Sequence, residues 1–250
     1  MSRGRTGGDP IRVGVAGLDH DHGLMLAARF WQAGAKIVAY DAHTTRNQLA
    51  MRALGTKATQ RSSLDIARSD DVDVVITAAI PSRRADIAVE ALRNGKDVVT
   101  DKPGVTTAQD LDRVDQAAAE SGKRWWVVFG ERFENRAVAE ACERARLGDI
   151  GEVVSVLGLG PHRLGAAGRP SWFWEPEHTG GILVDIGSHQ ADQFIAATGS
   201  LDVDVSGSAV GNVACPHHPD MEDIGMMTLR SGSVIGTHRV DYLSPTGLKT

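Results

Sequence analysis

Cysteine is scarce in this chain. It has only two cysteines, Cys142 and Cys215, and they lie far apart in no C-x-x-C spacing. Disulfide frameworks and zinc ribbons both require more cysteines at closer and more regular spacing. The sequence therefore predicts neither, and we interpret both thiols as packing residues.

An excess of positive charge is also missing. The 27 Lys and Arg residues stand against 32 Asp and Glu, for a formal net charge of -5, and no basic stripe is present. Nucleic-acid binders carry such a stripe, so no nucleic-acid partner is expected. No window has the roughly 20 apolar residues that span a bilayer, and residues 1–10 have no apolar run behind their positive charge. We therefore expect a cytoplasmic protein without a membrane partner.

Apolar strand-like runs alternate with helical patterns in the first half of the chain. The runs lie at 11–17, 35–41, 72–79, 96–100 and 123–129, and the helical patterns at 24–34, 44–54, 81–95 and 107–122. Thr44 is placed to cap the second helix. This alternation is typical of a doubly wound parallel sheet with helices on both faces. The α/β pattern predicts a Rossmann domain over residues 1–130.

The second half of the chain has a different order of helix and strand patterns. A helix is expected at 134–147, a strand at 152–160, a long irregular loop at 161–181 and one helix at 182–199. Strand patterns with turn signals between them follow at 202–213, 224–231 and 233–243. We predict an α+β domain with a mostly antiparallel open sheet over residues 131–250.

The stretch VAGLDHDHG at residues 15–23 lies where a Rossmann unit has its glycine-rich turn. The G-x-G-x-x-G fingerprint begins at Gly17, but Asp19 and His22 stand in place of its second and third glycines. Three interpretations are open. Asp19 caps the following helix while His20 and His22 donate to a phosphate, or the two histidines bind a metal, or tight dinucleotide binding is lost.

Two further stretches carry residues suited to chemistry. In VVTDKPGVTT, at 98–107, Lys102 follows a parallel strand at the edge where such sheets bind ligands, and Pro103 raises the chance of a cis peptide before it. A solvated surface lysine is the alternative. In GGILVDIGSHQADQF, at 180–194, Asp185, His189 and Asp192 share one helical face. That stripe predicts an acid/base unit, a metal site or an ordinary polar surface.

These motifs together resemble the glucose-fructose oxidoreductase / inositol dehydrogenase / MocA (Gfo/Idh/MocA) family over nearly the whole chain. The similarity is carried by the front turn, by Asp41 at the end of the second strand, by residues 78–103, by GDIGEVVSV and by residues 180–194. Asp101, Lys102 and Pro103 represent the family's E-K-P motif. Asp185 and His189 represent its D-x-x-x-H motif.

The resemblance implies an NAD(P)-dependent dehydrogenase that acts on CH-OH groups of a sugar, polyol or related compound. Lys102 would contact the substrate hydroxyl, His189 would exchange its proton, and Asp185 would bind or orient the reacting group. Asp41 would read the adenosine ribose and favour NAD over NADP. No metal is expected, and the implied cofactor-binding residues are Gly17, Leu18, Asp19, His20, His22, Asp41, Pro81, Arg84, Asp101 and Lys102.

The chain departs from the family pattern in two places and in length. Asp101 replaces a glutamate, which shortens the arm towards the nicotinamide ribose, and Arg84 stands where the family has histidine. Family members continue for roughly 80 to 130 more residues, so we expect the second domain to be incomplete. The open sheet of relatives often forms oligomer contacts, which implies a dimer or tetramer.

Two other functions stay open at this point. One is an NAD-dependent glycoside hydrolase or lyase that acts by transient oxidation, and the other is a non-catalytic sensor of nucleotide or sugar. The loop at 161–181 suits a sugar or an acidic sugar, although its tryptophans can equally be structural. Its aromatic and cationic residues are His162, Arg163, Arg169, Trp172 and Trp174.

Overall fold

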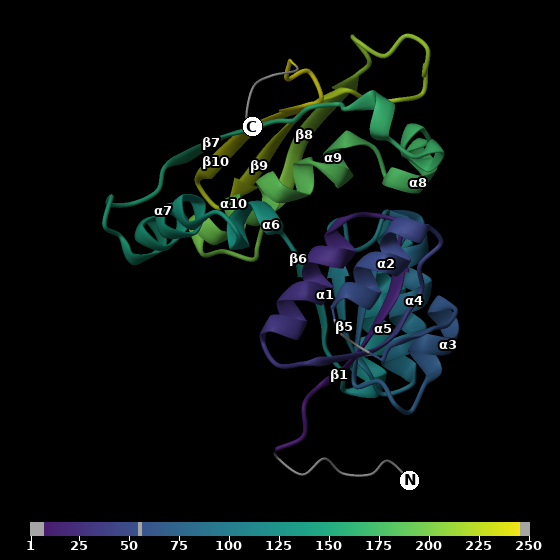
Figure 1. Cartoon of the computed structure of the whole chain (residues 1–250). Coiled ribbons are helices and arrows are strands. Elements are labelled where there is room, and N and C mark those ends of the chain that lie inside the picture. Colours follow the sequence, from purple (N-terminus) through teal and green to yellow (C-terminus); the bar gives the residue numbers. More distant parts are fainter. Residues whose placement is uncertain (1–7, 55–56, 246–250) are drawn as a thin grey trace. The chain divides into compact units, whose positions relative to one another are not determined.

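The computed structural model describes residues 8–54 and 57–245. The chain divides into two compact units, the first ending at Val128 and the second beginning at Phe129 (Figure 1). Each unit has its own sheet and its own hydrophobic core. The elements of each unit are therefore described separately.

A six-stranded parallel sheet with the order β3-β2-β1-β4-β5-β6 forms the first unit. Its strands are β1 (Arg12–Leu18), β2 (Lys36–Tyr40), β3 (Thr59–Gln60), β4 (Val74–Ala78), β5 (Asp97–Asp101) and β6 (Trp125–Val128). Its helices are α1 (His22–Gln32), α2 (Thr45–Ala53), α3 (Ser63–Arg68), the 3-10 turn η1 (Pro81–Arg83), α4 (Arg84–Arg93) and α5 (Ala108–Ser121). The strand order reverses between β1 and β4, which is where doubly wound sheets bind ligands.

Both faces of this sheet are buried, as the apolar strands predict. Helices α3, α4 and α5 cover one face, where their side chains pack on alternate strand residues such as Ala16 and Val75. Helices α1 and α2 cover the other face, where Leu26 and Met51 pack on Val13 and Ile76. The predicted doubly wound parallel sheet is confirmed.

Two elements of the first unit were not predicted. Strand β3 has only two residues, and the six-residue helix α3 follows it. Neither is long enough for a periodic pattern to show in the sequence. The expected cap at the second helix is present, because the Thr44 side chain accepts a hydrogen bond from the Asn47 amide at 3.2 Å.

The second unit has a four-stranded sheet with the order β7-β10-β9-β8. Its strands are β7 (Ser155–Pro161), β8 (Asp204–Gly211), β9 (Ile224–Ser231) and β10 (Val234–Asp241). Its helices and helical turns are α6 (Gly130–Phe133), α7 (Arg136–Leu147), η2 (Ala166–Gly168), η3 (Ser171–Trp174), α8 (Pro176–Thr179), α9 (Ile182–Asp185) and α10 (Gly187–Thr198). Two of the three pairings are antiparallel and β7 joins β10 in parallel, so the mostly antiparallel prediction is confirmed.

The helix expected at 182–199 is in fact two helices, so that prediction was wrong. Ile186 separates α9 from α10, and its φ of -100° departs from the helical value near -63°. Its side chain is buried in a cluster with Phe173, Ile182 and Tyr242. This packing is tertiary, and helical periodicity does not report it. The loop at 161–181 likewise contains the short turns η2, η3 and α8.

Only one face of the second sheet is covered by helices. Helix α10 packs on it through Phe194, which contacts Met227 and Leu229 of β9, and Figure 1 shows α9 and α10 along this face. The opposite face is open within the described chain. Large apolar side chains lie exposed there on three strands, namely Leu157 and Leu159 on β7, Met226 on β9 and Ile235 on β10.

Both cysteines are free, Cys215 buried and Cys142 half-buried, in line with a packing role. None of the helices found in residues 8–54 and 57–245 has the length and apolar character needed to cross a bilayer.

Candidate functional site

The candidate site of the first unit lies at the carboxyl edge of the parallel sheet, in the turn between β1 and α1. Gly17 has a φ of +83°, a conformation that favours glycine. A side chain there would lie 2.6 Å from the Ala79 Cβ, so the turn also passes close to the end of β4. The first fingerprint glycine therefore has the conformational and steric role that the Rossmann turn requires.

The third fingerprint glycine has moved by one residue. His22 occupies the expected position, but Gly23 follows it in the first turn of α1. A Cβ on Gly23 would lie 2.7 Å from the Leu18 side chain and 2.9 Å from the Ala78 side chain. Gly23 thus allows α1 to pack closely on β1 and β4, which is the physical role of the third glycine.

Asp19 does not cap α1, so the predicted cap was wrong. Its Oδ2 accepts a hydrogen bond from the Ile80 backbone N–H at 3.2 Å, after the end of β4. The N-cap position of α1 is Asp21, whose side chain makes no cap hydrogen bond. Asp19 lies too early in the turn to reach the first helical amides, and the neighbouring strand offers an amide that needs an acceptor.

A charged cluster joins this turn to the end of β5. The His22 Nδ1 lies 2.9 Å from Asp101 Oδ1, and the His20 Nδ1 lies 3.7 Å from Asp101 Oδ2. The Arg84 Nη2 lies 3.3 Å from Asp101 Oδ2, and both side chains are almost fully buried. Burial alone would raise the pKa of the Asp101 carboxyl, but the hydrogen bond from His22 and the Arg84 charge bring it below its ordinary value.

His20 is held neutral near physiological pH. Burial, and then the charge of His22, lower its pKa from 6.5 to about 4. Its Nδ1 accepts a hydrogen bond from the His22 backbone N–H at 3.3 Å, which is consistent with an unprotonated nitrogen. His20 and His22 therefore differ in environment, although they lie two residues apart.

Arg84 holds the backbone of the site. Its guanidinium donates to the carbonyl oxygens of Ala79, Asp101 and Pro103, each at 2.8 Å. The Lys102–Pro103 peptide bond is cis. Lys102 is buried, with only 7% of its surface exposed, so it is not the solvated surface lysine of the alternative interpretation. Arg84 acts on this turn through the backbone, in the place where the family pattern has histidine.

The remaining predicted cofactor residues of the first unit lie at the same edge. Asp41 follows β2 and is buried, and its Oδ2 accepts hydrogen bonds from the Ser63 amide at 2.8 Å and the Ser63 hydroxyl at 2.6 Å. The Leu18 carbonyl accepts from the Asn47 side chain at 2.7 Å, and Pro81 is buried at the start of η1.

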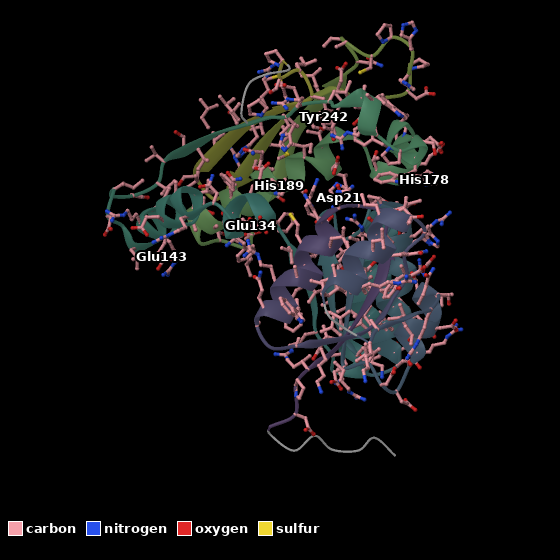
Figure 2. The ribbon with its side chains drawn as sticks, in the orientation of Figure 1. Asp21, Glu134, Glu143, His178, His189 and Tyr242 are labelled. Atoms are coloured by element: carbon pink, nitrogen blue, oxygen red, sulfur yellow. The ribbon has the colours of Figure 1, made fainter. Side chains whose placement is uncertain are left out.

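The second unit has a candidate site of its own around Asp185 and His189. The Tyr242 hydroxyl donates to Asp185 Oδ2 at 2.5 Å. Burial, and then the Asp185 charge, raise the pKa of Tyr242 well above its ordinary 10, so the phenol remains a donor and keeps the carboxylate in one orientation. Figure 2 labels Tyr242, just after β10, and His189, on α10.

Glu131, on the short helix α6, lies beside His189 and was not predicted from the sequence. Its Oε1 is 4.0 Å from the His189 Nε2 and 3.1 Å from the His162 Nε2. Its Oε2 accepts a hydrogen bond from the Gln193 side chain at 3.1 Å. No sequence motif includes Glu131, because its partners are His162, directly after β7, and two residues of α10, all distant in sequence.

Asp192 does not form one unit with Asp185 and His189, so the shared polar stripe was a wrong interpretation. Both Asp192 oxygens accept hydrogen bonds from Arg132 at 2.6 Å. Asp185 bonds Tyr242 instead. Each side chain of the stripe has a different partner, because α9 and α10 are separate helices.

The aromatic loop is largely structural in the described chain. The Arg169 guanidinium stacks 4.0 Å from the Phe173 ring centroid, and Phe173 in turn packs against Tyr242. The Trp174 ring stacks on His218 at 3.9 Å. These contacts place the loop around the Asp185–Tyr242 pair and support its position.

Two family models match most of the chain. Residues 11–129 match the model described as "Oxidoreductase family, NAD-binding Rossmann fold", and residues 138–249 match "GFO/IDH/MocA C-terminal domain". The chain belongs to the Gfo/Idh/MocA family. Its first matched stretch corresponds to the family's NAD-binding Rossmann fold and its second to the family's C-terminal domain.

Solved structures and curated proteins agree with this membership. A "putative oxidoreductase" from Erwinia carotovora atroseptica SCRI1043 is 34% identical with a TM-score of 0.89, over 96% of this chain and 72% of that one. The scyllo-inositol 2-dehydrogenase (NAD(+)) of Bacillus subtilis (strain 168) is 28% identical over 77% of this chain and 54% of its own length. The inositol 2-dehydrogenase of Salmonella paratyphi B (strain ATCC BAA-1250 / SPB7) is 31% identical over 58% of this chain and 44% of its own length. This Gfo/Idh/MocA chain thus spans about half the length of these curated relatives.

Two kinds of ligand suit the histidine turn of this family member. His20, His22 and Asp101 present ligand atoms within 4.8 Å of one another, as a metal site would. However, Arg84 lies 3.3 Å from the same carboxylate, and the positive charges of Lys102 and Arg84 act on His20. Two nearby cations disfavour a third positive charge and favour an anion.

Proposed function

We propose that this protein is an NAD-dependent oxidoreductase that moves a hydride between the cofactor and a hydroxyl carbon of a sugar, polyol or related compound. The observation that carries the proposal is the position of Lys102. This buried lysine follows β5 at the carboxyl edge of the sheet, on a turn held by Arg84 and next to the Gly17 turn. That edge is where doubly wound sheets bind nucleotides and their substrates.

The residues at this edge fit a dinucleotide. Gly17 supplies the close turn, and the positive charges of Lys102 and Arg84 near His20 suit a pyrophosphate. Asp41 lies at the end of β2, where a carboxylate accepts hydrogen bonds from the two ribose hydroxyls.

We assign residues 1–130 to this cofactor domain and residues 131–250 to substrate binding and oligomer contacts. The assigned cofactor residues are Gly17, Leu18, Asp19, His20, His22, Asp41, Pro81, Arg84, Asp101 and Lys102.

The proposed chemistry divides among three side chains. A bound nicotinamide supplies the hydride acceptor. His189 accepts the hydroxyl proton, and Lys102 stabilises the negative charge that develops on the oxygen. Asp185, oriented by Tyr242, binds a substrate hydroxyl or the reacting group.

The substrate class is supported by the relatives and by the local charge. The curated relatives include dehydrogenases named for inositol and D-xylose. In the second unit, Asp185 and Glu222 both line one small cavity. Carboxylates accept hydrogen bonds from hydroxyl groups and repel anions, so these two carboxylates favour a neutral polyol or sugar over an acidic sugar.

The direct test is a panel of sugars and polyols with NAD and NADP, followed by Lys102→Ala and His189→Ala. Each variant should lower turnover roughly a hundredfold or more, because general acid/base and electrostatic effects have that size. The exposed Lys36→Ala and His217→Ala serve as controls. Near-normal turnover in both site variants would reject the catalytic assignment.

Other outcomes of the same panel point to other functions. Sugar release without net NADH would indicate a hydrolase or lyase that oxidises its substrate transiently. Binding of nucleotide or sugar with no turnover would indicate a sensor. Either result would replace the dehydrogenase proposal.

The open face of the second sheet is proposed as a contact between copies of the chain, in a dimer or tetramer. Leu157 and Leu159 are 74% and 62% exposed, and Met226 and Ile235 are 48% and 42% exposed. These side chains lie on one face of three neighbouring strands and give that face several exposed apolar groups, with Thr237 and Arg239 of β10 between them. Such surfaces commonly mark protein interfaces.

A further inference from the structure

His189 is too buried to exchange a proton with solvent directly. Only 5% of its side chain is exposed, against 30% for Glu131 and 31% for His162. A base that accepts a proton in every turnover must also return it to solvent. The side chains next to His189 therefore decide how the proton leaves.

One oxygen of Glu131 lies near both histidines. Oε1 is 3.1 Å from the His162 Nε2 and 4.0 Å from the His189 Nε2. The other oxygen is held by Gln193 at 3.1 Å, which keeps Oε1 directed to the two rings. The 4.0 Å gap exceeds a hydrogen bond, and one water or a small carboxylate rotation closes it.

The contacts of His162 require an extra proton in this cluster. Its Nδ1 lies 3.1 Å from the Gly160 carbonyl oxygen, which can only accept, so Nδ1 carries a proton. Its Nε2 lies at hydrogen-bond distance from the Glu131 carboxyl. That contact needs a second proton, either on His162 or on Glu131, and the two groups therefore share one proton.

We propose that Glu131 and His162 form a proton path between His189 and solvent. The inference rests on the proposed function, in which the hydride leaves with the nicotinamide cofactor and the hydroxyl proton stays on His189. His189 then gives this proton from Nε2 to Glu131 Oε1. Glu131 passes a proton to the His162 Nε2, the partly exposed His162 ring releases one proton to water, and all three groups return to their first state.

Other charged groups around the path are already engaged. Arg132, next to Glu131 in sequence, bonds Asp192. The Tyr242 ring lies 6.5 Å from the His162 ring, and its hydroxyl bonds Asp185. The pH dependence of the path is therefore assigned to His189, Glu131 and His162.

The test uses the whole chain with a compound that it oxidises. Glu131→Gln and His162→Gln should each lower kcat about tenfold with KM nearly unchanged, because substrate contacts remain while proton release slows. Added imidazole should restore kcat of both variants, since a small base can replace the missing group.

The controls are Glu143→Gln, at a carboxylate paired with Arg146, and His217→Gln, at an exposed histidine. Imidazole should not affect either control. Normal kcat, or a loss that imidazole does not restore, would overturn the path.

A second measurement needs no turnover. Imidazole ¹⁵N shifts at neutral pH should show both His162 nitrogens protonated in the wild type, and one protonated nitrogen in Glu131→Gln. A single protonated nitrogen already in the wild type, or no change in the variant, would overturn the shared proton. If the wild type oxidises nothing on the panel, the proposed function fails alone, and the ¹⁵N result still decides the proton sharing.

Discussion

At the level of single residues, Asp41 should decide between the two nicotinamide cofactors. Ser63 holds one carboxylate oxygen through two hydrogen bonds, so the charge is fixed in place. A 2'-phosphate next to it would cost about 1 to 3 kcal/mol. NAD should therefore bind about five- to hundredfold tighter than NADP in calorimetric titrations.

The Asp41→Asn variant tests the origin of that preference. Asparagine keeps the shape and one acceptor for Ser63 but removes the charge, so the preference for NAD should shrink. Asp86→Asn, at an exposed carboxylate paired with Arg113, is the matched control and should change nothing. Equal or tighter NADP binding by the wild type would rule out this role of Asp41.

His20 should make the stability of the first unit depend on pH. Its pKa in the folded protein is about 4, against 6.5 for an ordinary histidine. Between pH 4 and pH 6.5, His20 is protonated in the unfolded chain and neutral in the folded chain. The free energy of unfolding should thus be fully retained above pH 6.5 and fall by at most about 3 kcal/mol as the pH drops to 4.

Denaturant titrations of the wild type and of His20→Asn at pH 7 and pH 4.5 measure this effect. The pH-dependent loss should be smaller in the variant, because asparagine does not titrate. His217→Asn is the control, since the His217 side chain is exposed. The same pH dependence in wild type and His20→Asn would show that other groups cause the loss.

At the level of elements, the contact of α1 with β1 and β4 depends on Gly23. The Cβ of an alanine would lie 2.7 Å from the Leu18 side chain and 2.9 Å from the Ala78 Cβ, so the helix would have to shift. Overpacking of this kind costs about 1 to 3 kcal/mol. Gly23→Ala should lower the unfolding midpoint and weaken NAD binding, because the cofactor turn precedes the helix.

Gly8→Ala is the control for this substitution. A Cβ on Gly8 would have nothing within 4 Å. Its unfolding midpoint and NAD affinity should match those of the wild type. If Gly23→Ala behaved in the same way, the close helix–strand contact would not be what this glycine provides.

At the level of the whole molecule, the open sheet face should hold copies of the chain together. Burying one leucine side chain contributes about 1.5 to 3 kcal/mol. Leu157→Lys and Leu159→Lys should therefore weaken self-association roughly tenfold or more each, as measured by sedimentation or light scattering. Leu49→Lys on α2, where the leucine is 58% exposed, is the control. A wild-type protein that is monomeric at high concentration would contradict the proposal.

Much of the molecule could be predicted from local patterns. Apolar strands alternating with helices indicated the doubly wound sheet, and the turn signals of the second half indicated its mostly antiparallel sheet. The weak points were short or interrupted elements. The two-residue β3 has too few residues for a period, and Ile186 breaks a helix that is continuous in its pattern.

The candidate site divides in the same way. The sequence by itself determined the residues that adjoin strand ends and motif helices, such as Asp41, Lys102 and His189, because chain order places them at one edge of a sheet or on one helix. Only the tertiary structure decided their partners. Asp19 bonds Ile80 rather than capping α1, and Glu131 joins two distant histidines. Hydrogen bonds and ion pairs act over a few ångströms in space, and separation along the chain does not record that distance.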